Sequence, residues 1–208
     1  MKPTKKAEQA KDGVIPVAQY EIHAIRERAH HSVINPSTAG PRRFIKPGEF
    51  FFGESDDQIH TLLGSCIAIV LWHPVLHIGG MCHFVLPERI GPHAVGQSAS
   101  TFDGHYADGA MALFEREATR RGTDLKEYQA KIFGGSYMQA SLTLVEDERI
   151  GTKNIKAVLK HLRSKEIPIL AAHVGEMGYR RIGFNVKSGN VWVKHQAFRN
   201  GQQQCNSC

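Results

Sequence analysis

The 208-residue chain is long enough for one domain with a sizeable core, and its 41% hydrophobic and 22% charged residues are ordinary for a soluble globular protein. The net charge of +6 arises largely from the leading segment and from short runs such as Arg120-Arg121, without interleaved aromatic residues. This pattern argues against a nucleic-acid partner and favours a solvated face or attraction to an acidic protein.

Residues 1–40 are polar and basic, and they contain no apolar run of signal-peptide length. No stretch of the chain approaches the roughly 20 apolar residues that a membrane helix requires. We therefore predict a cytoplasmic protein without membrane insertion. Residues 1–41 are expected to form a flexible basic extension, residues 42–198 a single domain and residues 199–208 a polar tail.

Short strands are predicted first, near residues 43–52, 58–63, 66–72 and 77–86. The apolar run before residue 73 is rich in β-branched residues and too short for a helix, and the HPVL sequence that follows it is a turn signal. The last two strands are therefore predicted to form an antiparallel hairpin in which Trp72 pairs with His77. That register places Cys66 directly opposite His83, with Cβ atoms roughly 4.5 to 5.5 Å apart.

Cys66 and His83 so placed are candidates for a nucleophile and its base, in the geometry of a thiolate–imidazolium pair. Strand alternation assigns Cys82 to the opposite, apolar face, so Cys82 is predicted to be a core residue and the reactive pair to lie away from the core. The turn at Gly64-Ser65 could leave backbone N–H groups free to bind a substrate oxygen. The alternative is that Cys66 and His83 are ordinary structural residues. A hairpin turn longer by one residue would also move each side chain to the opposite face of the sheet.

The rest of the chain alternates predicted helices and strands, which are a helix at 106–121, a strand at 129–133, a helix at 152–165, a strand at 167–173 and a hairpin around 187–189. Gly122 is expected to end the first helix and Thr152 to cap the second. Residues 92–105 are predicted to form a loop that could cover the site. The predicted fold is α/β, a single-domain layered sandwich with a mainly antiparallel or mixed sheet packed by two main helices.

A series of short motifs runs through residues 42–196, and they are TLLGSC at 61–66, GGMCHFVLP at 79–87, YAD at 106–108, KIFGGSYM at 131–138, IGTKNIKAVLKHL at 150–162 and the late Arg180. In this order they resemble the motifs of the chemoreceptor glutamine deamidase family CheD. The resemblance implies that Cys66 is the nucleophile, His83 the base and Thr61 the third member of a catalytic triad. The hairpin argument selects the first two independently, whereas Thr61 follows from the resemblance alone.

The resemblance also implies the activity of a protein-glutamine glutaminase, a hydrolase that converts glutamines of methyl-accepting chemotaxis receptors to glutamate through a thioester on Cys66, releasing ammonia. Neither a metal nor an organic cofactor is expected. The implied substrate is the cytoplasmic helical region of the receptors, and a CheC-type phosphatase is a further candidate partner. The alternatives are another papain-like acyl transfer, by a protease or transglutaminase, and a non-catalytic chemotaxis adaptor that binds receptor or phosphatase.

The chain departs from the family pattern at residues 173–178, where His173 and Glu176 replace an acidic residue and a Gly-Gly pair. Gly134-Gly135-Ser136 indicates either a close backbone approach near the cysteine or only a turn. Asp108 and Arg180 could form a structural ion pair or contact substrate. The C-terminal CxxC motif at residues 205–208 stands alone, which is weak support for zinc or redox chemistry.

Overall fold

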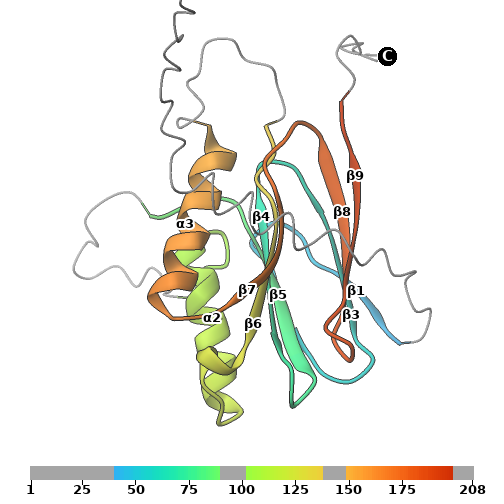
Figure 1. The fold of residues 1–208 in the computed structure, drawn as a ribbon, viewed down its shortest axis with the longest axis vertical. Coiled ribbons are helices and arrows are strands. Elements are labelled where there is room, and N and C mark those ends of the chain that lie inside the picture. Colours follow the sequence, from blue (N-terminus) through green and yellow to red (C-terminus); the bar gives the residue numbers. More distant parts are fainter. Residues whose placement is uncertain (1–39, 90–101, 138–148, 199–208) are drawn as a thin grey trace, which may run out of the picture.

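The structure is a computed structural model that describes residues 40–89, 102–137 and 149–198 (Figure 1). Almost all of the predicted N-terminal extension, most of the predicted 92–105 loop and the whole C-terminal tail with its CxxC motif lie outside these residues.

The described residues form two packed sheets with helices on one side (Figure 1). The four-stranded sheet has the order β1 (Arg42–Phe44), β3 (Gln58–Leu63), β8 (Tyr179–Asn185) and β9 (Val191–Gln196). The five-stranded sheet has the order β2 (Phe50–Gly53), β5 (Ile78–Phe84), β4 (Ile67–His73), β6 (Gln129–Gly134) and β7 (Ile169–Val174). Pairs are antiparallel except β1 with β3 and β6 with β7. The predicted α/β layered sandwich is confirmed, with its strands divided between two sheets.

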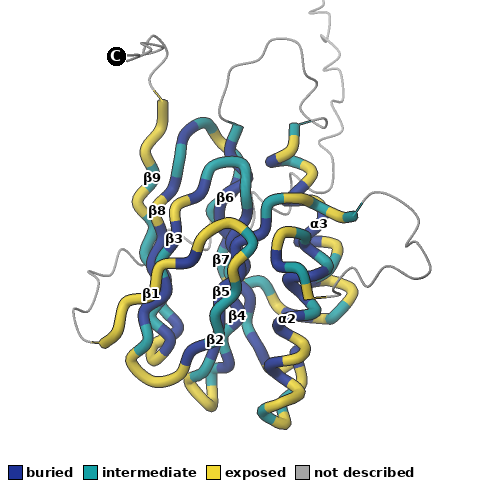
Figure 2. The backbone as a smooth tube through the Cα atoms, turned by 180° about the vertical axis from the view of Figure 1, so that it is seen from behind, coloured by how far each residue is buried: buried dark blue, intermediate teal, exposed yellow. Residues whose placement is uncertain are grey.

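Both faces of the β4–β5 hairpin are buried. Ile69 and Cys82 face the helices and share a core with Phe114. Val70 and Met81 face the four-stranded sheet and share a second core with its strands. Figure 2 shows the buried backbone concentrated between the layers, with exposed residues on the outer surfaces. The prediction of a core position for Cys82 is confirmed, but the opposite face does not lie away from the core, because a second sheet covers it.

Helices α2 (Ala107–Arg120) and α3 (Ile150–Ser164) cover the five-stranded sheet, and the short 3₁₀-helix η1 (Leu125–Glu127) follows α2. Both helices bury an apolar stripe of residues three or four positions apart. Gly122 follows α2 with φ +68°, a conformation that suits a residue without a side chain. The predicted cap Thr152 is wrong, because α3 begins two residues earlier and its N-cap is Arg149, which makes no side-chain capping bond. No described helix combines the length and apolar character needed to cross a membrane.

The single strand predicted at 43–52 is wrong. The chain instead leaves the four-stranded sheet after β1 and enters the five-stranded sheet at β2. The turn between them includes Gly48 at φ +81°, and the Lys46 N–H donates to the Glu49 side chain at 2.8 Å. The Pro47-Gly48 pair between the two apolar segments is a turn signal that the prediction of one strand overlooks.

The predicted hairpin register is also wrong, by two residues. Trp72 pairs with Gly79, and His83 pairs with Ala68. The turn starts one residue later than predicted, because His73 still belongs to β4 and pairs with Ile78. A shift of two residues preserves the face on which each side chain lies.

Candidate active site

Three connections in which the chain passes from one sheet to the other lie at the same end of the sandwich. They are residues 45–49 between β1 and β2, residues 64–66 between β3 and β4, and residues 175–178 between β7 and β8. The first contacts β3, because the Ile45 carbonyl accepts a hydrogen bond from Thr61 Oγ1 at 2.8 Å. The second and third are joined through Ser136, whose N–H donates to Gly64 O at 2.8 Å and whose hydroxyl donates to Gly175 O at 3.4 Å. All three predicted site residues lie at this end.

Thr61 and His83 join the two sheets by a hydrogen bond. Thr61 Oγ1 lies 2.8 Å from His83 Nδ1, and both side chains are buried. The Thr61 hydroxyl has one hydrogen and uses it on the Ile45 carbonyl, which can only accept. His83 Nδ1 must therefore carry the proton and donate to Thr61, which leaves the lone pair of the neutral ring on Nε2.

His83 Nε2 is buried and has no hydrogen-bond partner among the described residues. A buried acceptor without a hydrogen-bond donor destabilises the folded protein unless a ligand or substrate supplies the donor. The tautomer fixed by Thr61 therefore presents a free basic nitrogen inside the sandwich.

Cys66 lies in the crossover between β3 and β4, half-buried against the core between the sheets. His83 faces the same space, since its partner Thr61 comes from the four-stranded sheet. Continuing the observed register by one pair places Cys66 beside Val85 and diagonal to His83. Diagonal neighbours have Cα atoms roughly 7–8 Å apart and Cβ atoms somewhat closer, which long side chains can span. The direct pairing predicted from sequence is replaced by this diagonal arrangement, without a hydrogen bond to Nε2 in this structure.

Burial sets the protonation of both groups. It lowers the pKa of His83 to about 4, an effect that the Glu49 charge opposes and the His105 charge reinforces. Burial raises the pKa of the Cys66 thiol, and a hydrogen bond from its own backbone N–H opposes that shift. At neutral pH the resting pair is therefore a thiol and an imidazole, not the thiolate and imidazolium that the sequence suggested.

The turn that carries Cys66 is held by residues after β6. Gly135 N–H donates to Cys66 O at 2.8 Å. Gly134 has φ +107°, and a Cβ atom there would lie 2.1 Å from the same carbonyl oxygen. Of the two interpretations of the Gly-Gly-Ser motif, the close backbone approach is therefore the one that the structure bears out.

The sequence profile described as CheD chemotactic sensory transduction matches residues 85–195. The chain is 43% identical over 150 residues to a protein of Dechloromonas aromatica named probable chemoreceptor glutamine deamidase CheD 3, an alignment that covers 72% of this chain and 85% of that protein. The chain belongs to the CheD family. The chain is also similar to a Pseudomonas fluorescens protein named probable chemoreceptor glutamine deamidase CheD, with 40% identity over 73% of this chain and 83% of that protein. A Leptospira interrogans protein named probable chemoreceptor glutamine deamidase CheD 1 is 36% identical over 73% of this chain and 90% of that protein.

Two buried polar residues of this CheD-family chain support the site and were not predicted to do so. Asn154 on α3 donates to the backbone on both sides of the candidate pair. Its signal in the sequence is a polar residue within an otherwise apolar helical stripe. The fully buried Arg180 donates to Ser136 Oγ and forms an ion pair with Glu176 at 3.4 Å.

His173, Glu176 and His195 each offer a ligand atom within 4.8 Å of the others, which makes them a candidate metal centre in this CheD-family chain. Arg180 Nε, however, donates to His173 Nδ1 at 2.7 Å. The guanidinium keeps its protons, so Nδ1 must accept and Nε2 must carry the ring proton. His173 then has no lone pair left for a cation, and the trio cannot supply three ligands while Arg180 occupies this position. Burial and the charge of Arg180 lower the pKa of His173 to about 4, in keeping with a neutral acceptor.

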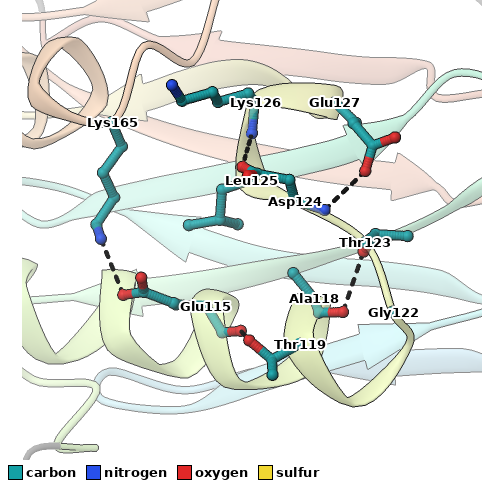
Figure 3. Close-up of a pocket in the computed structure, with 10 residues that line it drawn as sticks. All are labelled: Glu115, Ala118, Thr119, Gly122, Thr123, Asp124, Leu125, Lys126, Glu127 and Lys165. Carbon is teal, nitrogen blue, oxygen red and sulfur yellow. Dashed lines mark hydrogen bonds and ion pairs between the residues drawn. The ribbon is translucent and has the colours of Figure 1, made fainter.

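A cavity of about 650 Å³ opens at the C-terminal end of α2 and includes η1 and Lys165 in its lining (Figure 3). None of the three predicted site residues lines it. Its polar groups bond to one another, since Lys165 Nζ donates to Glu115 at 2.8 Å and the Asp124 side chain accepts from Lys126 N–H at 2.9 Å. The lining therefore presents no unpaired set of groups that specifies a ligand.

Proposed function

We propose that this chain is a protein-glutamine deamidase that acts on chemoreceptors, with Cys66 as nucleophile, His83 as base and Thr61 as the residue that orients the base. The observation that carries the proposal is the hydrogen bond of 2.8 Å between Thr61 Oγ1 and His83 Nδ1, which leaves Nε2 free. The names of the similar proteins support the same activity.

The first half of the reaction forms a thioester. As the Cys66 sulfur bonds to the side-chain carbonyl carbon of a substrate glutamine, its proton passes to His83 Nε2. The carbonyl oxygen becomes an oxyanion. The N–H groups of Ser65 and Cys66 donate to no backbone carbonyl among the described residues, and we assign them to this oxygen. The Cys66 N–H, which bonds to its own sulfur in the resting site, turns to the oxyanion as that sulfur bonds to carbon. The imidazolium then protonates the leaving nitrogen, and ammonia departs.

The second half regenerates the enzyme. His83 Nε2 takes a proton from water as the water oxygen attacks the thioester carbon. Collapse of the intermediate breaks the C–S bond, returns the proton to sulfur and releases glutamate. Throughout, Thr61 accepts from Nδ1–H, so it stabilises the imidazolium that forms in each half. This cycle needs only thiol, imidazole, backbone donors and water.

The product carries a new negative charge. On a receptor helix, replacing a neutral amide by a carboxylate changes repulsion between neighbouring helices and creates a glutamate that can be methylated. We propose the cytoplasmic helical region of chemoreceptors as the substrate. Association with a CheC-type phosphatase stays a prediction, and a pull-down of the purified proteins would test it.

The decisive experiment combines the chain with a chemoreceptor cytoplasmic fragment and follows glutamine peptides by mass spectrometry, with ammonia measured in parallel. Cys66→Ala and Cys82→Ala form a matched pair, because both remove a thiol but Cys82 lies in the helix-side core. Wild type and Cys82→Ala should convert amide to acid, and Cys66→Ala should not. Conversion by Cys66→Ala would refute the assignment of the nucleophile.

Other outcomes separate the alternatives. Chain cleavage would indicate a protease, and incorporation of an added amine would indicate a transglutaminase. A wild-type chain that binds the receptor fragment but changes no glutamine would indicate a non-catalytic adaptor and would refute the proposed activity.

A further inference from the structure

Asn154 lies in the second turn of α3 with its side chain fully buried. Its Nδ2 group donates to Ser65 O at 3.1 Å and to Val85 O at 2.8 Å. Both partners are carbonyl oxygens, which only accept, so the orientation of the amide is fixed. One side chain thus bridges the residue before Cys66 and the residue two positions after His83.

This bridge stands where the hairpin ladder stops. Cys66 and Val85 would form the next pair after the last pair of β4 and β5. They do not bond to each other, because Cys66 O accepts from the residue after β6 and Val85 N–H donates to His105 O at 2.9 Å. Cys66 and Val85 thus occupy a non-hydrogen-bonded position of the antiparallel ladder, where the backbone groups point away from the partner strand. The Asn154 amide adds a side-chain link between the two strands at this position.

The helix that carries Asn154 is a firm support. Its neighbours Ile155 and Val158 are packed into the helix-side core, so α3 moves only with that core. An amide held on such a helix, with both hydrogens engaged, restrains two loop segments in distance and direction at once. The Asn154 Oδ1 atom has no hydrogen-bond partner among the described residues. The two bonds from Nδ2 are therefore the hydrogen bonds that offset the burial of this polar side chain.

We propose that Asn154 is a positioning residue that sets the separation between the Cys66 thiol and the His83 imidazole. The inference rests on the proposed function, since it takes these two side chains as nucleophile and base. Without the bridge, the turn bearing Cys66 relaxes away from β5, and proton transfer to Nε2 slows. A displacement of about 1 Å at a reacting group can cost on the order of 100-fold in rate.

Three variants isolate this role. Asn154→Ala removes both donors, and Asn154→Asp keeps the shape of the side chain but has at most one hydrogen to donate, so it cannot bridge both carbonyl oxygens. Leu159→Ala is the matched control, because Leu159 is buried on the same helix but belongs to the apolar core. Asn154→Ala and Asn154→Asp should each lower kcat for receptor glutamines on the order of 100-fold, with KM near that of wild type. Leu159→Ala should lose thermal stability while keeping its kcat.

A double-mutant cycle gives a readout that does not require deamidation. The rate at which iodoacetamide alkylates Cys66, located by peptide mass spectrometry, is compared in wild type, Asn154→Ala, His83→Gln and the double variant. Each single change should slow alkylation about tenfold, and the double variant should be no slower than His83→Gln, because Asn154 acts through the distance to that base. Asn154→Asp replaces Asn154→Ala in the cycle if the alanine variant does not fold.

The outcomes separate this inference from the proposed function. Additive effects in the cycle, or wild-type kcat in both Asn154 variants, would overturn the positioning role while leaving the deamidase proposal intact. If the alkylation cycle shows coupling but the wild-type chain converts no receptor glutamine, the positioning role is supported and the deamidase proposal is refuted. Alkylation that is unaffected by His83→Gln would overturn both.

Discussion

Replacing Thr61 by valine tests the tautomer argument on which the site depends. Valine fills nearly the same space in this fully buried position but has no hydroxyl. The change removes the acceptor of the bond of 2.8 Å from His83 Nδ1 and the donor of the bond of 2.8 Å to Ile45 O. Both remaining groups are left unpaired inside the protein, at about 1–3 kcal/mol of stability each.

The catalytic effect is distinct from this loss of stability. In each half-reaction the His83 ring becomes an imidazolium whose Nδ1–H donates to Thr61, and a hydrogen bond to a charged group contributes about 1.5–3 kcal/mol. At about 1.36 kcal/mol per tenfold change, its loss lowers kcat about 10- to 150-fold. Without Thr61 the proton is also free to move to Nε2, which removes the base.

Thr61→Ser is the control, because it keeps the hydroxyl at a small packing cost. Turnover of receptor glutamines is measured by mass spectrometry and the stability of each variant by thermal unfolding, and nitrogen NMR of labelled histidine identifies the tautomer of His83. Thr61→Ser should retain the Nδ1–H tautomer and most of the activity. A folded Thr61→Val variant with wild-type kcat would refute the reasoning, as would equal losses in the two variants.

Further predictions concern pH and the glycine beside the nucleophile. Because burial lowers the pKa of His83 to about 4, kcat/KM should stay level through neutral pH and fall only near pH 4, whereas an acidic limb near pH 6.5 would contradict the neutral resting pair. The pKa of His173 is also lowered to about 4, so the unfolded state binds more protons than the native state between pH 4 and the ordinary value of 6.5. Stability measured by urea unfolding should therefore fall as pH drops through that window, by up to about 1.4 kcal/mol per pH unit for each histidine, and a flat profile would refute burial of neutral rings. Gly134→Ala should destabilise the protein by several kcal/mol and abolish activity, since its Cβ would lie 2.1 Å from Cys66 O, whereas Gly122→Ala, with nothing within 4 Å, should cost about 1 kcal/mol and leave kcat unchanged.

Local patterns in the sequence determined most of the secondary structure. The stripes of α2 and α3 repeat every three or four residues, and this spacing is sufficient to place a helix on a core. The core position of Cys82 followed from strand alternation, which depends only on parity. The order of the motifs indicated the CheD family, because such a resemblance depends on which residues follow one another and not on where they lie in space.

Sequence periodicity failed where the chain changes sheets. Pro47-Gly48 marks a break between two strands, but hydrophobic alternation does not indicate that the second strand joins another sheet. The turn after His73 was placed one residue early, and this shifted the predicted partner of Cys66 by two positions. Hydrophobic alternation fixes the face of a residue but not its partner, so the parity was right and the pairing wrong.

The sequence by itself therefore determined which segments become helices or strands, which face each residue occupies and which family the chain resembles. The tertiary structure alone decided that a second sheet closes over the face of His83, that Thr61 from this sheet fixes the tautomer and that Asn154 from α3 spans the open end of the hairpin. The physical reason is that helix and strand preferences act over a few residues. Hydrogen bonds between groups 22, 69 or 89 residues apart depend on how whole layers pack.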